Sequence, residues 1–106
     1  MATPLLCLST CPDTEIASRI ARTLVEERLA ACVNRLPGVP STYRWQGRVV
    51  EDAEVLLVIK TTRERLGALR DRLVELHPYE VPELVALDIT GGLDPYLAWI
   101  GAETAP

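Results

Sequence analysis

Residues 42–61 read TYRWQGRVVEDAEVLLVIKT, and this stretch predicts a long β-hairpin at the centre of the fold. Thr42 to Trp45 favours a strand, Gln46-Gly47-Arg48 is typical of a tight turn, and Val49 begins the returning strand. Val55 to Ile59 is an unbroken aliphatic run, which predicts a central strand covered on both faces.

The chain before the hairpin predicts a strand and then an amphipathic helix. Leu5 to Cys11 is a short apolar run that indicates a buried strand. Pro12 suits the first turn of a helix, and apolar residues recur at helical spacing from Asp13 to Leu29. Ala31 to Leu36 starts the first strand of the hairpin, and a bend or bulge is expected before Thr42 at Pro37, Gly38 and Pro40.

The chain after the hairpin predicts a second helix, a fourth strand and a short last helix. Thr61 and Glu64 have the spacing of a capping box, and Pro78 ends the helix that follows. Leu84 to Ile89 indicates a strand, and Asp94 is placed to cap the last helix. The inner stripe of the second helix consists of Leu66, Leu69, Leu73 and Leu76.

The order β-α-β-β-α-β plus a terminal helix predicts a single α+β domain over residues 1–106. It is the order of a ferredoxin-like βαββαβ sandwich, in which two helices cover one face of a four-stranded antiparallel sheet. A chain of 106 residues fits one domain, and because it contains no Phe its core must be filled by aliphatic side chains.

The predicted hairpin is too long for the rest of this fold. Val49 to Thr61 spans roughly 43 Å at about 3.3 Å per residue, whereas a helix from Asp13 to Leu29 spans roughly 26 Å at about 1.5 Å per residue. A projecting hairpin with aromatic side chains is marginally stable alone and prone to stray pairing, and a partner subunit solves both problems. We therefore predict an oligomer. The alternative is a hairpin that bends back on its own sheet.

The composition argues against several classes of protein. The net charge of −4 disfavours nucleic acid and anionic membrane surfaces as partners. A signal peptide is not expected, and the sequence has no apolar run of about 20 residues. The odd number of Cys residues without a CxxC motif favours a reduced, cytoplasmic protein. An enzyme is not expected, because the chain has neither a Gly-rich phosphate loop nor a recognisable nucleophile motif.

Several segments in a fixed order resemble the CutA divalent-cation tolerance family. The resemblance covers nearly the whole chain, from the first strand to the last helix. It rests on ACVN (31–34), YRWQG (43–47), the later Glu54, KTT (60–62), HPYEVPE (77–83) and YLAW (96–99).

The resemblance implies a homotrimer of ferredoxin-like subunits, similar in architecture to PII signalling proteins, whose long hairpins pair between subunits. It implies a role in tolerance of divalent metals, with copper bound by some members and no established enzymatic reaction. The first hypothesis is therefore a trimer that binds or responds to copper or another divalent cation. The second is a PII-like signalling or scaffold trimer that binds a small metabolite or a protein partner in its intersubunit clefts.

His77, the only His in the chain, is the first candidate metal ligand. Imidazole nitrogen is a common ligand for copper and zinc, and the resemblance associates a His at this position with copper binding. The alternative is a His whose ring is favoured by the dipole at the end of the second helix. Glu83 offers a carboxylate close by in sequence, which suits weak binding of divalent cations; the alternative is a solvated surface carboxylate.

Cys11 is the second candidate ligand, and here the sequence departs from the family pattern. Some metal-binding members have a Cys at the end of the first strand and two adjacent His before the Pro. Ser9 and Leu76 stand at those positions here, and Cys11 lies two residues further along. A tight site for a soft metal is therefore not expected.

The remaining candidates are cleft or interface residues. Tyr43 and Trp45 alternate on one strand and share a face, where they line a cleft or, as we favour, pack at a subunit contact. Trp99 on the last helix is interpreted likewise as packing. Glu54 and Lys60 flank the aliphatic strand and each needs a polar partner if buried; together they predict either an anion or small-molecule site or a structural salt bridge.

Overall fold

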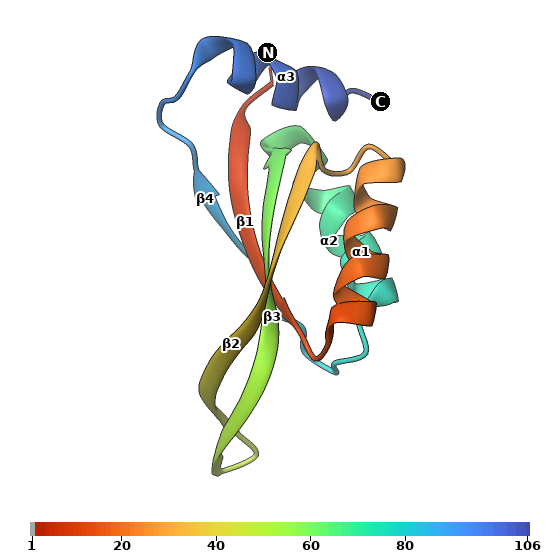
Figure 1. The fold of residues 1–106 in the computed structure, drawn as a ribbon. Coiled ribbons are helices and arrows are strands. Elements are labelled where there is room, and N and C mark those ends of the chain that lie inside the picture. Colours follow the sequence, from red (N-terminus) through yellow and green to blue (C-terminus); the bar gives the residue numbers. More distant parts are fainter. Residues whose placement is uncertain (1) are drawn as a thin grey trace.

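The fold is built on a four-stranded antiparallel sheet with the strand order β2-β3-β1-β4 (Figure 1). The computed structural model describes residues 2–106. Its elements are β1 (Pro4–Cys11), α1 (Thr14–Glu26), β2 (Cys32–Trp45), β3 (Arg48–Thr62), a 3₁₀ turn (Arg63–Arg65), α2 (Leu66–Leu76), β4 (Val85–Asp88) and α3 (Asp94–Glu103). The predicted order of strands and helices is confirmed.

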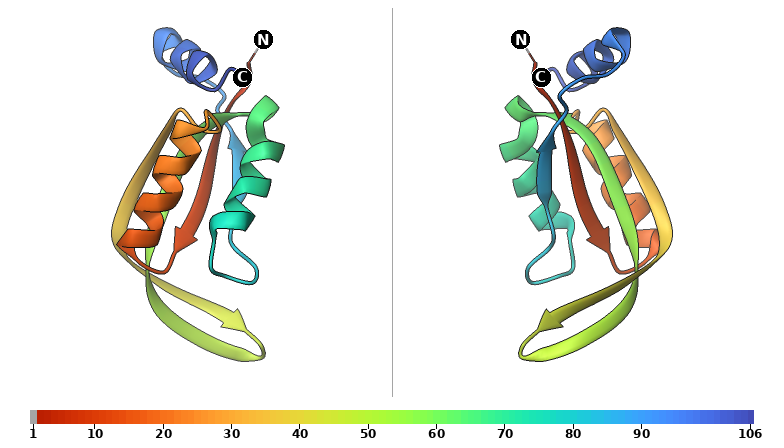
Figure 2. Two further views of the ribbon diagram at one scale, coloured as in Figure 1. Left: turned by 90° about the vertical axis from the view of Figure 1, so that its right-hand side faces the viewer. Right: turned by 90° about the vertical axis from the view of Figure 1, so that its left-hand side faces the viewer.

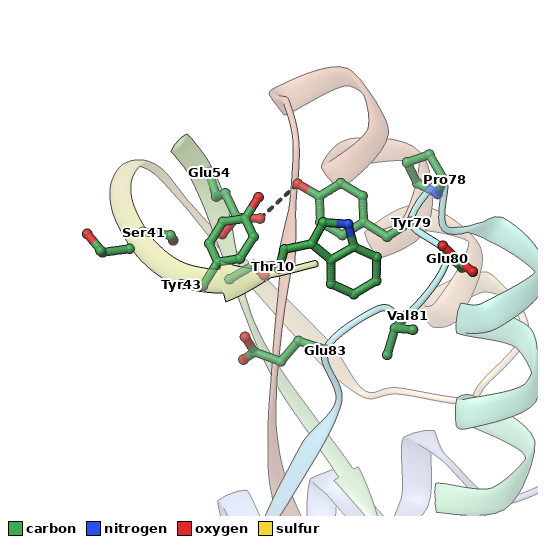
Figure 3. Close-up of a pocket in the computed structure, with 11 residues that line it drawn as sticks. Thr10, Ser41, Tyr43, Glu54, Pro78, Tyr79, Glu80, Val81 and Glu83 are labelled. Atoms are coloured by element: carbon green, nitrogen blue, oxygen red, sulfur yellow. Dashed lines mark hydrogen bonds between the residues drawn. The ribbon is translucent and has the colours of Figure 1, made fainter. Parts of the chain in front are cut away.

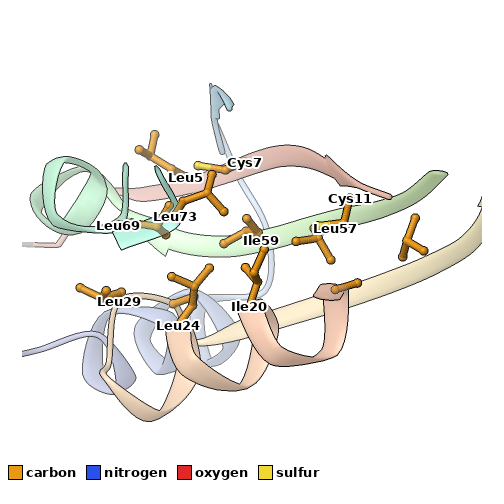
Figure 4. Packing of buried hydrophobic residues seen from close by; sticks show 13 residues of the cluster. Leu5, Cys7, Cys11, Ile20, Leu24, Leu29, Leu57, Ile59, Leu69 and Leu73 are labelled. Carbon is orange, nitrogen blue, oxygen red and sulfur yellow. The ribbon is translucent and has the colours of Figure 1, made fainter. Parts of the chain in front are cut away.

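The hydrophobic core lies between one face of the sheet and the two helices α1 and α2, which cover that face (Figures 2 and 4). Because side chains alternate along a strand, only every second residue of β1 and β3 enters this core. The predicted aliphatic composition is confirmed, because the buried cluster consists of Leu, Ile, Val, Ala and Cys side chains. Its fully buried members include Cys7, Cys11, Ile20, Leu24, Leu57, Ile59, Leu69 and Leu73.

The opposite face of the sheet is largely apolar and open, with Asn34 and Lys60 as polar residues on it. Leu8 on β1 pairs with Val58 on β3, and both side chains are only half-buried. Toward the edges of this face, Leu36, Val85 and Leu87 are 43–48% exposed. The prediction that residues 55–59 are covered on both faces is therefore wrong for one copy of the chain. An aliphatic residue at every position gives the strand two apolar faces, but α1 and α2 cover only one of them.

The hairpin formed by β2 and β3 extends beyond the lower end of α1, as its length predicts (Figure 1). Gln46 (φ 49°) and Gly47 (φ 77°) form the turn, and two successive positive φ angles are the geometry of a type I′ turn. Between Leu36 and Val39 the pairing shifts at a bulge that contains Gly38 (φ 71°). The hairpin also curves, and Figure 2 shows it passing across the lower end of the molecule toward the loop after α2. It thus projects without folding back on its own sheet.

The start of α2 differs from the prediction. Thr61 and Glu64 do not form a capping box. The Thr61 hydroxyl donates a hydrogen bond of 2.7 Å to the Leu29 carbonyl, and a Glu64 carboxylate oxygen accepts one of 2.9 Å from the Thr3 amide. Both side chains therefore tie segments distant in sequence to the end of β3, and a 3₁₀ turn leads into α2 instead.

The two other helices begin within one residue of their predicted starts, and Pro12 precedes α1 instead of lying in its first turn. Asp13 is the N-cap of α1, where its carboxylate accepts a 2.8 Å hydrogen bond from the Ile16 amide. Asp94 is not a cap; it is the first helical residue of α3 and follows the N-cap Leu93. No helix within residues 2–106 has the length and hydropathy needed to cross a membrane.

Candidate functional site

A cleft of about 660 Å³ lies between the curved hairpin and the loop over residues 77–84 (Figure 3). β1 and β3 supply its floor, the hairpin one wall and the loop the other. Its lining residues are Thr10, Ser41, Thr42, Tyr43, Trp45, Glu54, Pro78, Tyr79, Glu80, Val81 and Glu83. Cavities of this volume suit small-molecule ligands.

The loop is held against the end of β1 by hydrogen bonds at both of its ends. His77 Nε2 lies 2.7 Å from the Thr10 carbonyl, and His77 Nδ1 accepts a 3.1 Å hydrogen bond from the Tyr79 amide. At the other end, the Ser9 hydroxyl donates a 2.7 Å hydrogen bond to the Glu83 carbonyl. A carbonyl oxygen can only accept, so His77 carries its proton on Nε2. The loop wall of the cleft is therefore fixed by side chains from the core.

Glu54 and Tyr79 form a part-buried polar contact in the cleft. Glu54 is only 6% exposed, and the Tyr79 hydroxyl donates a 2.8 Å hydrogen bond to its Oε2 atom (Figure 3). Burial raises the pKa of Tyr79 well above its ordinary value, and the hydrogen bond to the Glu54 carboxylate raises it further. The contact therefore holds Tyr79 in its protonated, hydrogen-donating form.

The rest of the cleft is acidic and aromatic. Glu80 and Glu83 are exposed along the loop wall, and Tyr43 and Trp45 are 38% and 40% exposed on the hairpin. The Tyr43 hydroxyl donates a 2.6 Å hydrogen bond to Asp52, which raises the pKa of Tyr43. No Lys, Arg or His is among the residues that line the cleft. Its charge therefore favours cationic ligands over anionic ones.

The three predicted metal ligands do not converge. His77 is buried with both ring nitrogens engaged, and Cys11 faces the core on the other side of the sheet. Burial, with the nearby carboxylates of Glu54 and Asp13, raises the pKa of the Cys11 thiol to about 11, so the thiolate that a metal needs is disfavoured. Only Glu83 reaches the cleft. Residues 2–106 contain no group of three or more His, Cys, Asp or Glu side chains arranged to hold a metal ion.

The structure places some of the predicted cleft residues at the cleft and others away from it. Tyr43, Trp45 and Glu54 line the cleft. Lys60 does not; its Nζ donates a hydrogen bond to the Asn34 side chain toward the other end of β3. Glu54 and Lys60 therefore form no salt bridge within one copy of the chain, and a shared site between subunits stays a prediction. Trp99 is 40% exposed on α3, where its ring lies 5.4 Å from that of Tyr96.

Tyr79 and Glu80 line the cleft, although the sequence did not predict either of them as a binding residue. Both belong to the segment HPYEVPE, which carries the family resemblance. That segment could have drawn attention to them, but no local pattern shows that Tyr79 meets Glu54, which lies 25 residues earlier.

Comparison with known protein families identifies the lineage of this chain. Residues 5–103 match the model of the family described as CutA1 divalent ion tolerance protein. The chain belongs to the CutA1 family. The resemblance seen in the sequence motifs is thereby confirmed.

Curated CutA1 relatives are similar over most of this chain. The divalent-cation tolerance protein CutA of Thermus thermophilus is 56% identical over 97 residues, which cover 92% of this chain and 94% of that protein. The human protein CutA is 50% identical over 91 residues, which cover 86% of this chain but only 51% of that protein. The chain thus spans about half the length of its human relative.

Solved CutA structures have the same fold. The crystal structure of CutA from Xylella fastidiosa superposes with a TM-score of 0.94 at 48% identity, covering 97% of this chain and 99% of that one. The protein from Thermus thermophilus superposes with a TM-score of 0.94 at 53% identity, covering 96% and 99%.

Relatives of this chain are named for different cellular compartments. The Arabidopsis thaliana relative is named chloroplastic, and the Archaeoglobus fulgidus structure is described as a periplasmic divalent cation tolerance protein. The cytoplasmic location of this family member therefore stays a prediction.

Proposed function

We propose that this CutA1 family member acts in divalent-cation tolerance as a homotrimer of ferredoxin-like subunits that binds hydrated copper or other divalent cations weakly. The observation that carries the proposal is the acidic cleft, where Glu54, Glu80 and Glu83 line one cavity without a basic side chain. Carboxylate oxygens are suitable ligands for hydrated divalent cations. Because the carboxylates do not form a closed set of ligands, the cation keeps its water shell and binding is weak.

The carboxylates are preferred to His77 as the site of this binding. A metal at His77 would have to displace either the Thr10 carbonyl or the Tyr79 amide from the ring, and both contacts hold the loop in place. Cys11 is fully buried in the core, where a metal ion in the cleft does not reach it. The proposed role is thus binding, without a catalytic step.

The open face of the sheet supports the proposed assembly. Leu36, Val85 and Leu87 are exposed there beside half-buried aliphatic residues, and a second apolar surface would cover them. The family resemblance carried by the hairpin motifs YRWQG and KTT implies three copies. Light scattering should give about 35 kDa, three times the chain mass of 11.7 kDa. A particle of 11.7 kDa at micromolar concentration would contradict the assembly.

The metal site is tested by calorimetric titration with copper and zinc. The double variant E80Q/E83Q should bind copper at least about fivefold more weakly than the wild type, because two carboxylates that attract the cation are neutralised. Exposed Glu15 on α1 does not line the cleft, so E15Q is the matched control and should bind as the wild type does. Loss of binding in H77A, with E80Q/E83Q unaffected, would move the site to His77.

A signalling or scaffold trimer that binds a small metabolite is the second candidate function. The specific observation in its favour is the volume of the cleft, about 660 Å³, which exceeds what a single hydrated ion requires. A thermal-shift screen of metabolites should find compounds that raise the melting temperature, and variants of Glu54 should abolish the shift. A screen without any stabilising compound would count against this role.

A further inference from the structure

The cleft combines a buried carboxylate with aromatic walls, and this combination is specific enough to name a class of ligand. Three of its lining residues carry aromatic side chains, Tyr43, Trp45 and Tyr79. Pro78 and Val81 add apolar surface beside them on the loop wall. Such a surface favours a flat apolar group over a bare ion, because aromatic and apolar side chains contribute through area and stacking.

Glu54 offers a carboxylate oxygen to which a ligand in this cleft can bind. Its Oε2 atom accepts the Tyr79 hydroxyl, and within residues 2–106 no Lys, Arg or His forms a salt bridge with it. No fully enclosed side-chain oxygen among the described residues lacks a partner, so the second Glu54 oxygen is accessible from the cleft. A carboxylate that is 6% exposed and has no cationic partner favours a ligand that supplies one.

The aromatic rings favour the same charge as the carboxylate. The faces of Trp and Tyr rings carry negative potential and attract organic cations, which is how aromatic cages recognise ammonium groups. Trp45 and Tyr43 reach the cleft from the hairpin, whereas Tyr79 reaches it from the loop. An ammonium group at Glu54 would thus lie in a cleft with aromatic residues on both of its walls.

We propose that this cleft binds an organic monocation, a protonated amine carried on a flat apolar group, with the ammonium on Glu54 and the apolar group against the rings of Tyr43 and Trp45. The inference deepens the second candidate function and rests on it for its biological meaning. It replaces the anionic metabolite expected from Glu54 and Lys60, since Lys60 lies outside the cleft. It requires no metal, although both ligands would occupy the same cleft.

The test uses three probes of similar shape and different charge. The 2-phenylethylammonium ion, neutral 2-phenylethanol and anionic 3-phenylpropionate are titrated into the full chain by calorimetry at pH 7, with EDTA present to exclude metals. The cation should bind at least about tenfold more tightly than the alcohol, because it adds a charge-assisted hydrogen bond at Glu54. The anion should give no measurable heat of binding.

Variants locate the site. E54Q keeps an acceptor for the Tyr79 hydroxyl but removes the negative charge. It should weaken binding of the 2-phenylethylammonium ion at least about tenfold. E15Q, outside the cleft, should bind as the wild type does. If E54Q fails to fold, W45L serves instead, because Trp45 is 40% exposed at the end of the hairpin, and it should weaken binding about threefold or more.

Each other outcome overturns the inference in a recognisable way. Equal affinity for the alcohol and the ammonium ion would show that charge plays no part. Binding of 3-phenylpropionate alone would overturn the cationic ligand while leaving a metabolite-binding role standing. Absence of binding by all three probes would count against this ligand class, and against the second candidate function only if the wider thermal-shift screen is also negative.

Discussion

The hydroxyl of Tyr79 donates a 2.8 Å hydrogen bond to Glu54, a carboxylate that is only 6% exposed. This contact joins the loop after α2 to the point where the hairpin leaves the sheet. It therefore fixes the shape of the cleft as well as the position of its most buried charge.

Removing this hydroxyl should destabilise the protein. Y79F leaves Glu54 without its donor, and we expect the free energy of unfolding to fall by about 1–3 kcal/mol, the cost of losing a hydrogen bond to a buried charged group. Urea denaturation followed by circular dichroism measures it. Y43F is the matched control, because the bond from Tyr43 to Asp52 is exposed, and its effect should stay within about 0.5 kcal/mol. Equal effects of both variants would contradict this account.

Stability should decline in mildly alkaline solution. Burial raises the pKa of Cys11 to about 11, and the pKa of Tyr79 is raised too, so the folded chain retains these protons longer than the unfolded chain does. The contribution of Cys11 is complete below about pH 8 and is lost as the pH rises through 9 toward 11, whereas that of Tyr79 is lost only above about pH 10. Urea denaturation at pH 7, 9 and 10.5 should show the decline. C11V should make it shallower, and an unchanged slope in C11V would exclude Cys11 as a cause.

The three thiols should react in a fixed order. Cys7 and Cys11 are fully buried in the core, whereas Cys32 is half-buried at the start of β2. A chromogenic disulfide reagent should therefore modify one thiol per chain in the native state and three in urea. C32S should abolish the native reaction. Rapid native modification of C32S would show that the core opens at β1.

His77 should behave as a structural residue with one fixed tautomer. Its Nε2 atom faces the Thr10 carbonyl and its Nδ1 atom accepts the Tyr79 amide, so nitrogen NMR should show the proton on Nε2. H77A should lower the free energy of unfolding by about 2–4 kcal/mol, because it removes a buried ring and two hydrogen bonds. A mobile ring that exchanges tautomers at pH 7.5 would contradict this role.

Arg28 should hold α3 on the body of the protein. Its Nε and Nη2 atoms donate hydrogen bonds of 2.9 Å and 3.0 Å to the carbonyls of Ala105 and Ala102. R28A should cost about 1 kcal/mol, since the contact is partly exposed, and should speed amide hydrogen exchange in α3. R22A removes only an exposed pair with Glu26 on α1 and should leave α3 protected. Unchanged exchange in R28A would assign the anchoring of α3 to its buried side chains, such as Ile100 and Thr104.

Much of the fold follows from local sequence patterns. The leucine stripe of α2 places Leu69 and Leu73 in the core, and the long aliphatic run becomes β3. The prediction of a capping box was wrong because Thr61 and Glu64 form hydrogen bonds with Leu29 and Thr3 instead. These partners are distant in sequence, so a four-residue pattern does not predict them.

The candidate site was less predictable than the fold. Strand alternation predicted that Tyr43 and Trp45 share a face, and both line the cleft together with Glu54. The favoured interpretation of the two aromatic residues, packing at a subunit contact, stays a prediction. His77 and Cys11 were candidate metal ligands because of their chemical type and the family resemblance, with a structural role as the alternative for His77. Residue type does not reveal that hydrogen bonds engage both nitrogens of His77 or that Cys11 points into the core.

The sequence by itself determined the order of elements, the family, the aliphatic core and a hairpin longer than its helices. These properties depend on the period of side chains along a strand or helix, which is local. Only the tertiary structure decided that one sheet face stays open, that the hairpin curves toward the loop after α2, and that Tyr79 meets Glu54. Such contacts join residues far apart in the chain, so they depend on how the elements pack and on no single segment.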